Sequence, residues 1–334
     1  MINSTSFDNW NDFIPDICIY HSFNEYAPCP DGIASAWVVY KRFMSVNPLM
    51  KFKGMNYNEI QDFNWGKFSN QKIIIVDFSI PFSLVNQLEN KGNQVIIIDH
   101  HKSFYDDFKE YFSNQKIYSF DNFKFDEKVC GALACWELFF PCDLPPTFLL
   151  YVNDRDLFKK QLPFTDEIHL SMGSGSNKEY PKFKREFGHF DQMVFDEIEF
   201  GWDYVKSYLF PIGEYYKKSR EEKILKILNN PKKFIHWDEV PIVFLNSSEM
   251  SLKSDISEYV QLNLEKSEDY FFVVIINKKD LSRVKVKTIL EIDLLSLFSD
   301  LDATGHSTAC GFPWLEGDMD ELKELVVQKY WQCF

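Results

Sequence analysis

The first part of the chain alternates short apolar runs with amphipathic stretches. Three runs rich in β-branched residues predict strands at residues 16–22, 72–79 and 94–101. Each run is followed by a stretch in which apolar positions recur with helical spacing, and this order is typical of a parallel sheet buried on both faces. Residues 128–140 and 145–154 predict two further helices. We therefore expect an α/β fold whose first domain is built around a parallel sheet.

A long charged and aromatic region separates this pattern from a second one. Residues 187–236 lack β-branched runs and predict a helical connector. After it, the pattern predicts strands at 241–247, 270–277 and 283–290 and helices at 251–265 and beyond 317. We expect a first domain at residues 1–186, the connector, and a smaller α/β domain at residues 237–334.

Polar residues with metal-binding side chains end each of the three predicted strands. These residues are His21 after the first strand, Asp77 after the second, and Asp99, His100 and His101 after the third. Because ligands of a parallel sheet bind beyond the carboxyl ends of its strands, we expect these side chains to meet at one edge. The acidic turn at residues 153–156 closes a predicted helix in the same way.

Imidazoles and carboxylates together predict a divalent-metal site. The candidate ligands are His21, Asp31, Asp77, His100 and Asp154. Such a set suits Mn²⁺ or a similar borderline cation, and a carboxylate that bridges two ions gives the two-metal geometry of phosphoryl transfer. The alternative interpretation is helix capping, by Asp31 for the helix after the Cys-Pro-Asp-Gly segment and by Asp77 for the helix that begins near Pro81.

The second domain carries a weaker signal for phosphate binding. Residues 303–312 place His306 beside Gly305 in a loop of small residues, where backbone N–H groups can approach a phosphate. Lys285 and Lys287 alternate along a predicted strand and point to one face. The alternatives are a tight turn with an incidental histidine and lysines that keep an edge strand soluble.

Charge and composition narrow the classes of partner. The chain has 36 basic and 50 acidic residues and a formal net charge of −14, which argues against a surface for long duplex nucleic acid. No apolar run approaches the roughly 20 residues of a spanning helix. The polar, acidic N-terminus lacks the features of a signal peptide, and the seven cysteines include no CxxC pair. We expect a cytoplasmic protein with free thiols and no membrane partner.

In their order and spacing, these motifs resemble those of the DHH phosphoesterase superfamily with a C-terminal DHHA1 domain, in particular a subgroup with Cys-Pro-Asp-Gly. The matching segments are residues 17–32, VDFS at 76–79, DHH at 99–101, GALACWELFFP, YVNDRDLF, and the Gly-His loop at 305–311. The resemblance implies a hydrolase that uses divalent ions, usually two Mn²⁺ with Mg²⁺ as an alternative, in a cleft between its two domains. The expected substrates are short single-stranded oligonucleotides or nucleotide phosphates.

The resemblance also assigns roles residue by residue. It implies that Asp31, Asp77, His100 and Asp154 are metal ligands and that His21 binds the other ion. From its position beside the two histidines at a strand end, we expect Asp99 to hold an imidazole tautomer by a hydrogen bond. The resemblance further implies that His101 contacts the metal site or the substrate phosphate, and that Lys287, Gly305 and His306 hold the substrate. The catalytic set is thus Asp77, His100 and His101.

Two positions depart from the superfamily's usual pattern. Cys29 stands where many members have an acid, and a thiolate there would ligate softer ions than Mn²⁺. Lys287 replaces the usual arginine, and a lysine lacks the bidentate fork for phosphate. Three alternatives stay open: a cyclic-dinucleotide phosphodiesterase, a pyrophosphatase, and a catalytically silent protein that binds a nucleotide or a partner. The sequence does not predict the oligomeric state.

Overall fold

The structure is a computed structural model that describes residues 13–24, 27–101, 123–173, 187–238, 240–263, 272–277, 280–314 and 318–333. The chain forms two compact units, Met1–Lys217 and Lys218–Phe334. The division falls within the long helix α8 (Trp202–Leu228), so the predicted connector is shared between the units. The predicted boundary at residue 186 lies outside the described residues.

The first unit contains the predicted parallel sheet. Its parallel strands follow the order β3 (Lys51–Met55), β1 (Ile17–Asn24), β4 (Lys72–Val76), β5 (Gln94–Asp99) and β6 (Phe123–Phe125). The short strand β2 (Ala27–Pro28) pairs antiparallel with the end of β1. The prediction of an α/β fold with a parallel sheet is therefore confirmed.

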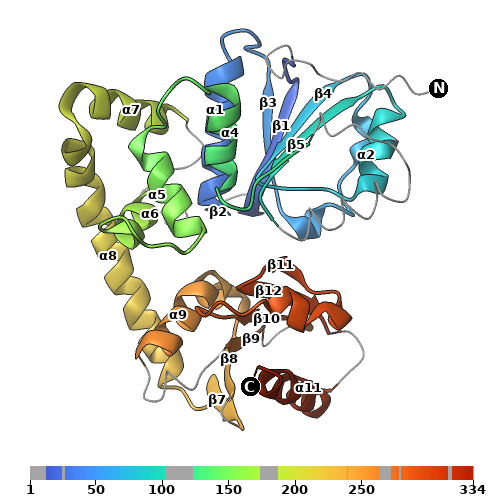
Figure 1. The fold of residues 1–334 in the computed structure, drawn as a ribbon, viewed down its shortest axis with the longest axis vertical. Helices are drawn as coiled ribbons and strands as arrows, with labels where there is room; N and C mark the ends of the chain where they lie inside the picture. The colour runs from blue at the N-terminus through green and yellow to red at the C-terminus, as the bar shows by residue number, and fades with distance from the viewer. Residues whose placement is uncertain are drawn as a thin grey trace. The chain divides into compact units, whose positions relative to one another are not determined.

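Helices cover both faces of this sheet (Figure 1). Helices α1 (Pro30–Phe43) and α4 (Gly131–Phe139) lie on one face, and α2 (Phe82–Glu89) lies on the other. Side chains alternate along each strand, so the residues toward α1 and α4 are Cys18, Ile74, Val76, Ile96 and Ile98, and those toward α2 are Ile19, Ile73, Ile75, Val95 and Ile97. Burial on both faces explains why these strands are continuously apolar.

A group of helices beside α1 completes the first unit. Helices α5 (Thr147–Asp156) and α6 (Thr165–Gly173) contact α1, and α7 (Gly188–Phe200) leads into α8. Asp166 forms ion pairs with Arg155 at 3.0 Å and with Lys160 at 2.8 Å. These contacts hold the start of α6 against the end of α5. In the part of the chain that the structure describes, every helix is too short or too polar to cross a membrane.

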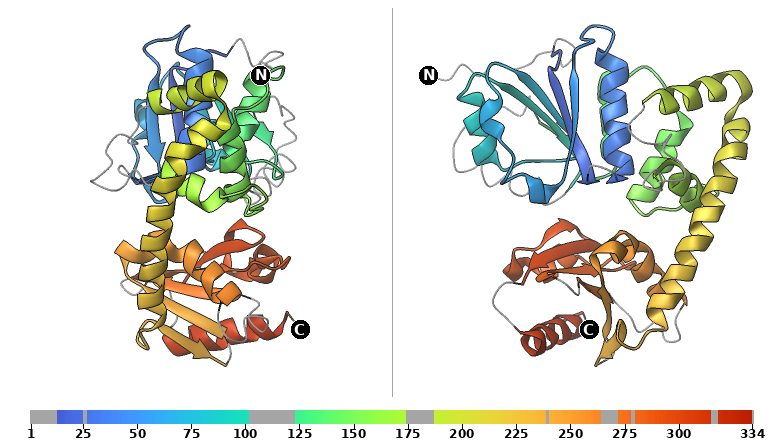
Figure 2. Two further views of the ribbon diagram at one scale, coloured as in Figure 1. Left: turned by 90° about the vertical axis from the view of Figure 1, so that its left-hand side faces the viewer. Right: turned by 180° about the vertical axis from the view of Figure 1, so that it is seen from behind.

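The second unit is a separate sheet with its own helices. Its strand order is β11 (Thr304–His306), β12 (Ala309–Pro313), β10 (Asp280–Lys287), β9 (Val273–Asn277), β8 (Val240–Leu245) and β7 (Phe234–Trp237). Strands β8 and β9 are parallel, and the other neighbours are antiparallel. Helix α11 (Met319–Trp331) packs on one face of this sheet (Figure 2), and α9 (Lys253–Asn263) packs on the other.

Candidate metal centre

Asp77 follows β4 in a left-handed backbone conformation. Its φ is +51°, and its N–H donates to the Ile98 carbonyl at 2.9 Å, which ties the turn to the neighbouring strand. A left-handed conformation is uncommon for a residue other than glycine, although aspartate tolerates it, and such residues cluster at functional sites. The capping interpretation is wrong for this residue, because the N-cap of α2 is Pro81.

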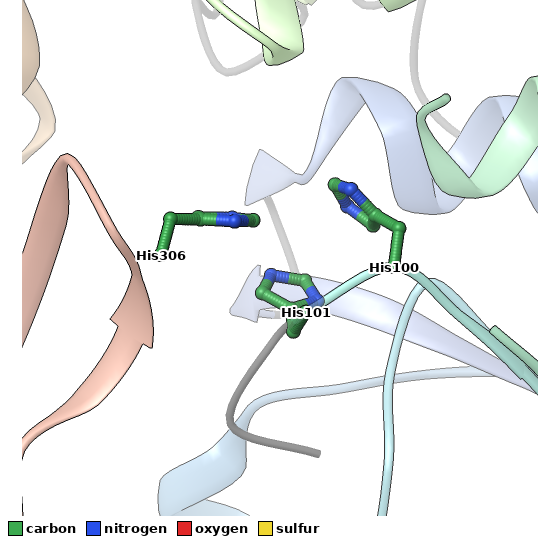
Figure 3. A group of neighbouring side chains, drawn as sticks. All are labelled: His100, His101 and His306. Carbon is green, nitrogen blue, oxygen red and sulfur yellow. The ribbon is translucent and has the colours of Figure 1, made fainter. Parts of the chain in front are cut away.

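Asp99, the last residue of β5, holds the two histidines that follow it. Figure 3 shows these two histidines. Asp99 Oδ1 accepts hydrogen bonds from the His100 backbone N–H at 2.8 Å and from the His101 backbone N–H at 3.3 Å, and it lies 2.7 Å from His101 Nδ1. The two imidazole centroids are 4.5 Å apart. One buried carboxylate therefore fixes both the turn and the orientation of the His101 ring.

Asp31 joins two helices at the site. It is the second residue of α1, whose N-cap is Cys29, so the interpretation of Asp31 as the cap of its own helix is wrong. Its two carboxylate oxygens instead accept the backbone N–H groups of Gly131 at 2.7 Å and of Ala132 at 2.8 Å. These N–H groups begin α4 and have no partner within that helix, so Asp31 stabilises the start of a helix about 100 residues further along the chain.

Three carboxylates converge on His100 Nε2. This nitrogen lies 3.2 Å from Asp77 Oδ1, 3.5 Å from Asp31 Oδ2 and 3.4 Å from Asp156 Oδ2. An imidazole nitrogen carries at most one hydrogen and cannot donate to three acceptors. Ligand atoms about 2.1 Å from a common cation lie about 3.0–3.4 Å from one another in octahedral or tetrahedral geometry. The observed distances match those of a metal-ligand set.

A second group of potential ligands shares Asp77 with the first. His21, Cys29 and Asp77 each offer one atom, and the three atoms lie within 4.8 Å of one another. His21 Nδ1 is 3.6 Å from Asp77 Oδ2. Gly32 allows the start of α1 to lie this close to His21 in β1, because a Cβ on residue 32 would come within 2.1 Å of the His21 carbonyl oxygen. Asp77 thus directs one oxygen toward each group.

Asp154 lies elsewhere, and its predicted role as a ligand requires correction. Its carboxylate accepts the backbone N–H groups of Gln161 at 2.9 Å and Leu162 at 3.0 Å and the Thr165 hydroxyl at 2.5 Å. These bonds hold the turn between α5 and α6. Asp156, two residues later at the end of α5, contacts His100 in its place. Asp154 and Asp156 belong to the same predicted acidic turn, and the sequence pattern does not indicate which of the two carboxylates faces the site.

Tyr57 is a further residue at the site that sequence analysis missed. It lies in a short 3₁₀ helix (Tyr57–Glu59) after β3, with its ring centroid 5.5 Å from that of His21 and 6.3 Å from that of His101. It also packs against Phe78 at 4.7 Å. The ring is partly exposed and therefore forms part of the rim of the site. Its surroundings, MNYNEI, contain no pattern that would have indicated this position.

The pKa values of the buried acids and of His100 indicate an excess of negative charge at the site. Burial acts to raise the pKa of Asp77, but the hydrogen bond to His100 and the nearby imidazole of His21 outweigh it and hold that pKa well below its usual value. Burial acts to lower the pKa of His100, but Asp77 and its neighbours raise it to about 10. Burial and the charge of Asp77 raise the pKa of both Asp31 and Asp156. The acids therefore repel one another as the site stands.

The donor atoms fit divalent cations. Four aspartates (Asp31, Asp77, Asp99 and Asp156) surround the histidines and place four carboxylates at the site. Within the described ranges of the chain, Oδ2 of Asp77 and Oδ2 of Asp156 are buried and accept no hydrogen bond. Buried carboxylate oxygens without donors are costly unless a cation compensates them.

The second unit contains the other predicted site residues. His306 (Figure 3) and Lys287 are both paired with Ala309 across three adjacent strands, so their side chains lie on the same face of that sheet. Gly305 has a φ of +130° within β11, and a Cβ there would come within 2.4 Å of the Ala309 carbonyl oxygen. Residues 304–306 of the loop predicted at 303–312 thus form a strand of a hairpin that requires its glycine. All seven cysteines are free thiols, as predicted.

A parallel α/β sheet with carboxylates and imidazoles at one edge defines a class of proteins with a metal centre at their strand ends. Residues 17–143 match the family model described as "DHH family, N-terminal domain". That range contains the three strand ends and Asp31, but it ends before Asp154 and Asp156.

Individual proteins also resemble the chain in sequence or in fold. Uncharacterized protein R106 of Acanthamoeba polyphaga mimivirus is 27% identical over 162 residues, which are 46% of this chain and 36% of that protein, so the chain spans about a third of this relative. The DHH domain of a member of a family of ribosomal proteins has a TM-score of 0.56 at 14% identity, over 96% of this chain and 87% of that one, and it shares the fold. Exonuclease RecJ bound to manganese has a TM-score of 0.44 at 15% identity, over 95% of this chain and 89% of that one.

Proposed function

We propose that the protein is a metal-dependent phosphoesterase that hydrolyses short single-stranded oligonucleotides or nucleotide phosphates. The observation that carries this proposal is the position of Asp77, whose Oδ1 is 3.2 Å from His100 Nε2 and whose Oδ2 is 3.6 Å from His21 Nδ1. One carboxylate between two ligand groups is the arrangement of two-metal phosphoryl-transfer sites. The net charge of −14 supports short substrates over long polymers.

The two ligand groups would hold one cation each. Asp31, Asp77, His100 and Asp156 would hold the first, and His21, Cys29 and Asp77 the second. When bound, such cations lower the pKa of water and offset the negative charge that develops on a phosphoryl group. Mn²⁺ suits the first set, because three of its four donors are carboxylates and one is an imidazole.

His101 is suited to transfer a proton to the leaving group. Its Nδ1 is held by Asp99 at 2.7 Å, so the orientation of the ring is set before the substrate binds. Burial acts to lower the pKa of His101, but the charge of Asp99 outweighs it and raises that pKa above its usual value. The raised pKa favours the protonated ring relative to a free imidazole, and we propose that Nε2 donates its proton to the leaving oxygen.

His306 and Lys287 would bind the substrate through its phosphate or its far end. Their common face in the second unit supports this role, and Ala309 between them is too small to fill the space. We expect His306→Ala to raise KM on a dinucleotide about tenfold while the metal content stays unchanged. A loss of metal from this variant would assign the histidine to the metal centre instead.

The experiment that tests the proposal is release of mononucleotide from a labelled dinucleotide or trinucleotide, with and without Mn²⁺. Asp77→Ala should abolish turnover and reduce bound metal. Asp126→Ala is the matched control, because this partly exposed aspartate accepts a local bond from the Lys128 backbone N–H. Turnover that survives Asp77→Ala would refute the mechanism.

The same assay separates the alternatives. A panel that adds a cyclic dinucleotide and pyrophosphate identifies the preferred phosphoester or phosphoanhydride. Binding of nucleotide without turnover of any compound in the panel would instead identify a catalytically silent binding protein.

A further inference from the structure

We propose that the two halves of this metal centre select different metals, with Zn²⁺ favoured beside Cys29 and Mn²⁺ favoured beside His100. This inference rests on the proposed function, since it assumes that the centre holds divalent cations. It concerns the group formed by His21, Cys29 and Asp77, which differs in donor chemistry from the group around His100.

The thiol of Cys29 belongs to the site by position. Cys29 is the N-cap of α1, and its carbonyl accepts the first hydrogen bond of that helix, from the Ile33 N–H at 2.9 Å. The residue is 7% exposed, and its Sγ lies within 4.8 Å of ligand atoms of His21 and Asp77.

A second observation points independently to a cation at this position. Asp77 is 1% exposed, and its Oδ2 accepts no hydrogen bond from the residues that the structure describes. This oxygen is the one that lies toward His21, at 3.6 Å from Nδ1. A buried carboxylate oxygen without a donor, directed at an imidazole and a thiol, requires a positive charge for compensation.

The donor atoms of the two groups favour different cations. The group with Cys29 supplies one sulfur, one nitrogen and one oxygen, a set typical of Zn²⁺ sites, and thiolates favour such softer ions over Mn²⁺. The group around His100 supplies oxygens from Asp31, Asp77 and Asp156 and one nitrogen, a set that retains Mn²⁺. Because Asp77 is common to both, the difference in selectivity arises from Cys29.

The test uses the full-length protein, stripped of metal and titrated with Co²⁺. A cobalt–thiolate bond gives a charge-transfer absorption band in the near ultraviolet that oxygen and nitrogen ligands do not give. We expect this band in the wild type and its loss in Cys29→Ser. Cys18→Ser is the control, because Cys18 is another buried thiol of the first unit, within β1.

A competition experiment measures selectivity directly. The protein is equilibrated with equal concentrations of Zn²⁺ and Mn²⁺, and bound metals are counted by elemental analysis. We expect one of each in the wild type, and a fall of at least about tenfold in the preference for Zn²⁺ over Mn²⁺ in Cys29→Ser and Cys29→Asp. Circular dichroism verifies that each variant is folded. If a variant does not fold, the charge-transfer band of the wild type still reports whether a thiolate binds the cation.

The outcomes distinguish this inference from the proposed function. Two bound cations and turnover without a thiolate band would overturn the inference alone. An unchanged Zn²⁺ to Mn²⁺ ratio in folded Cys29→Asp, or loss of the band in folded Cys18→Ser, would do the same. A wild-type protein that binds no divalent cation would overturn both.

Discussion

Substitution of Gly131 by alanine tests whether the close approach of α4 to Asp77 shapes the metal centre. A Cβ on Gly131 would lie 2.7 Å from Asp77 Cβ, 3.0 Å from Asp77 Cα and 3.1 Å from Asp31 Oδ2. Two of these atoms belong to the rigid part of Asp77, so neither can rotate away. The Gly131 N–H also donates to Asp31 at 2.7 Å, which prevents α4 from retreating without loss of that bond.

The expected magnitude follows from these distances. Relief of the contact with Asp77 Cβ requires about 0.7 Å of movement to reach the 3.4 Å of ordinary contact. Overpacking of this kind costs about 1–3 kcal/mol, which lowers the melting temperature by roughly 2–10 °C. Because the shift falls on the carboxylate between the two ligand groups, we expect divalent-metal affinity to fall about 10–100-fold.

Gly188→Ala is the matched control for this substitution. Gly188 and Gly131 are each the first residue of a helix, so the change in helix propensity is the same, but a Cβ on Gly188 would meet no atom within 4 Å. The assays are thermal melting and metal titration of both variants. Equal metal affinity and equal melting temperature for Gly131→Ala and the wild type would show that the close approach of α4 to Asp77 does not shape the metal centre.

Three further predictions follow from the contacts around the site. Asp154→Asn should destabilise the first unit by about 2 kcal/mol without loss of metal, whereas Asp156→Asn should lose metal without loss of stability. Calorimetry and metal analysis test the pair, and the reverse result would show that Asp154 and not Asp156 is the metal ligand. Asp99→Asn should lower kcat about 10–100-fold by releasing His101, with wild-type kcat as the contrary outcome. Burial acts to raise the pKa of Asp166, but its two basic partners outweigh it and lower that pKa; its stabilising effect is therefore present above pH 3.8 and lost as the pH falls through the lower folded value. Acid titration of the free energy of unfolding should show a shallower decline in Asp166→Asn, and an identical decline would refute this.

The hydrophobic pattern was enough to predict the ends of the strands and thus part of the site. Apolar runs before Asp77 and before Asp99 could only be buried strands, and polar residues that end such strands must lie at the edge of the sheet. The order of the motifs was also enough to predict the match of residues 17–143 to the DHH family model. Both predictions depend on local spacing, which the sequence contains directly.

Residues on helices and turns were harder to assign. Asp154 and Asp156 occur in the same acidic turn, and their roles separate only because the chain at residues 161–165 folds back and donates hydrogen bonds to Asp154. The alternative interpretation of Asp31 as the cap of its own helix failed because its carboxylate binds the start of α4 instead. Tyr57 reaches the rim only through the parallel pairing of β3 with β1.

The amino-acid sequence by itself determined which residue types end each strand, the α/β character of both units and the supply of histidines and acids at one edge. Only the tertiary structure decided which carboxylates face His100 and which of them are used to hold turns and helix ends. The physical reason is that a buried carboxylate accepts hydrogen bonds from whichever donors surround it, and for Asp31 and Asp154 these donors come from a helix or a turn that the local sequence does not specify.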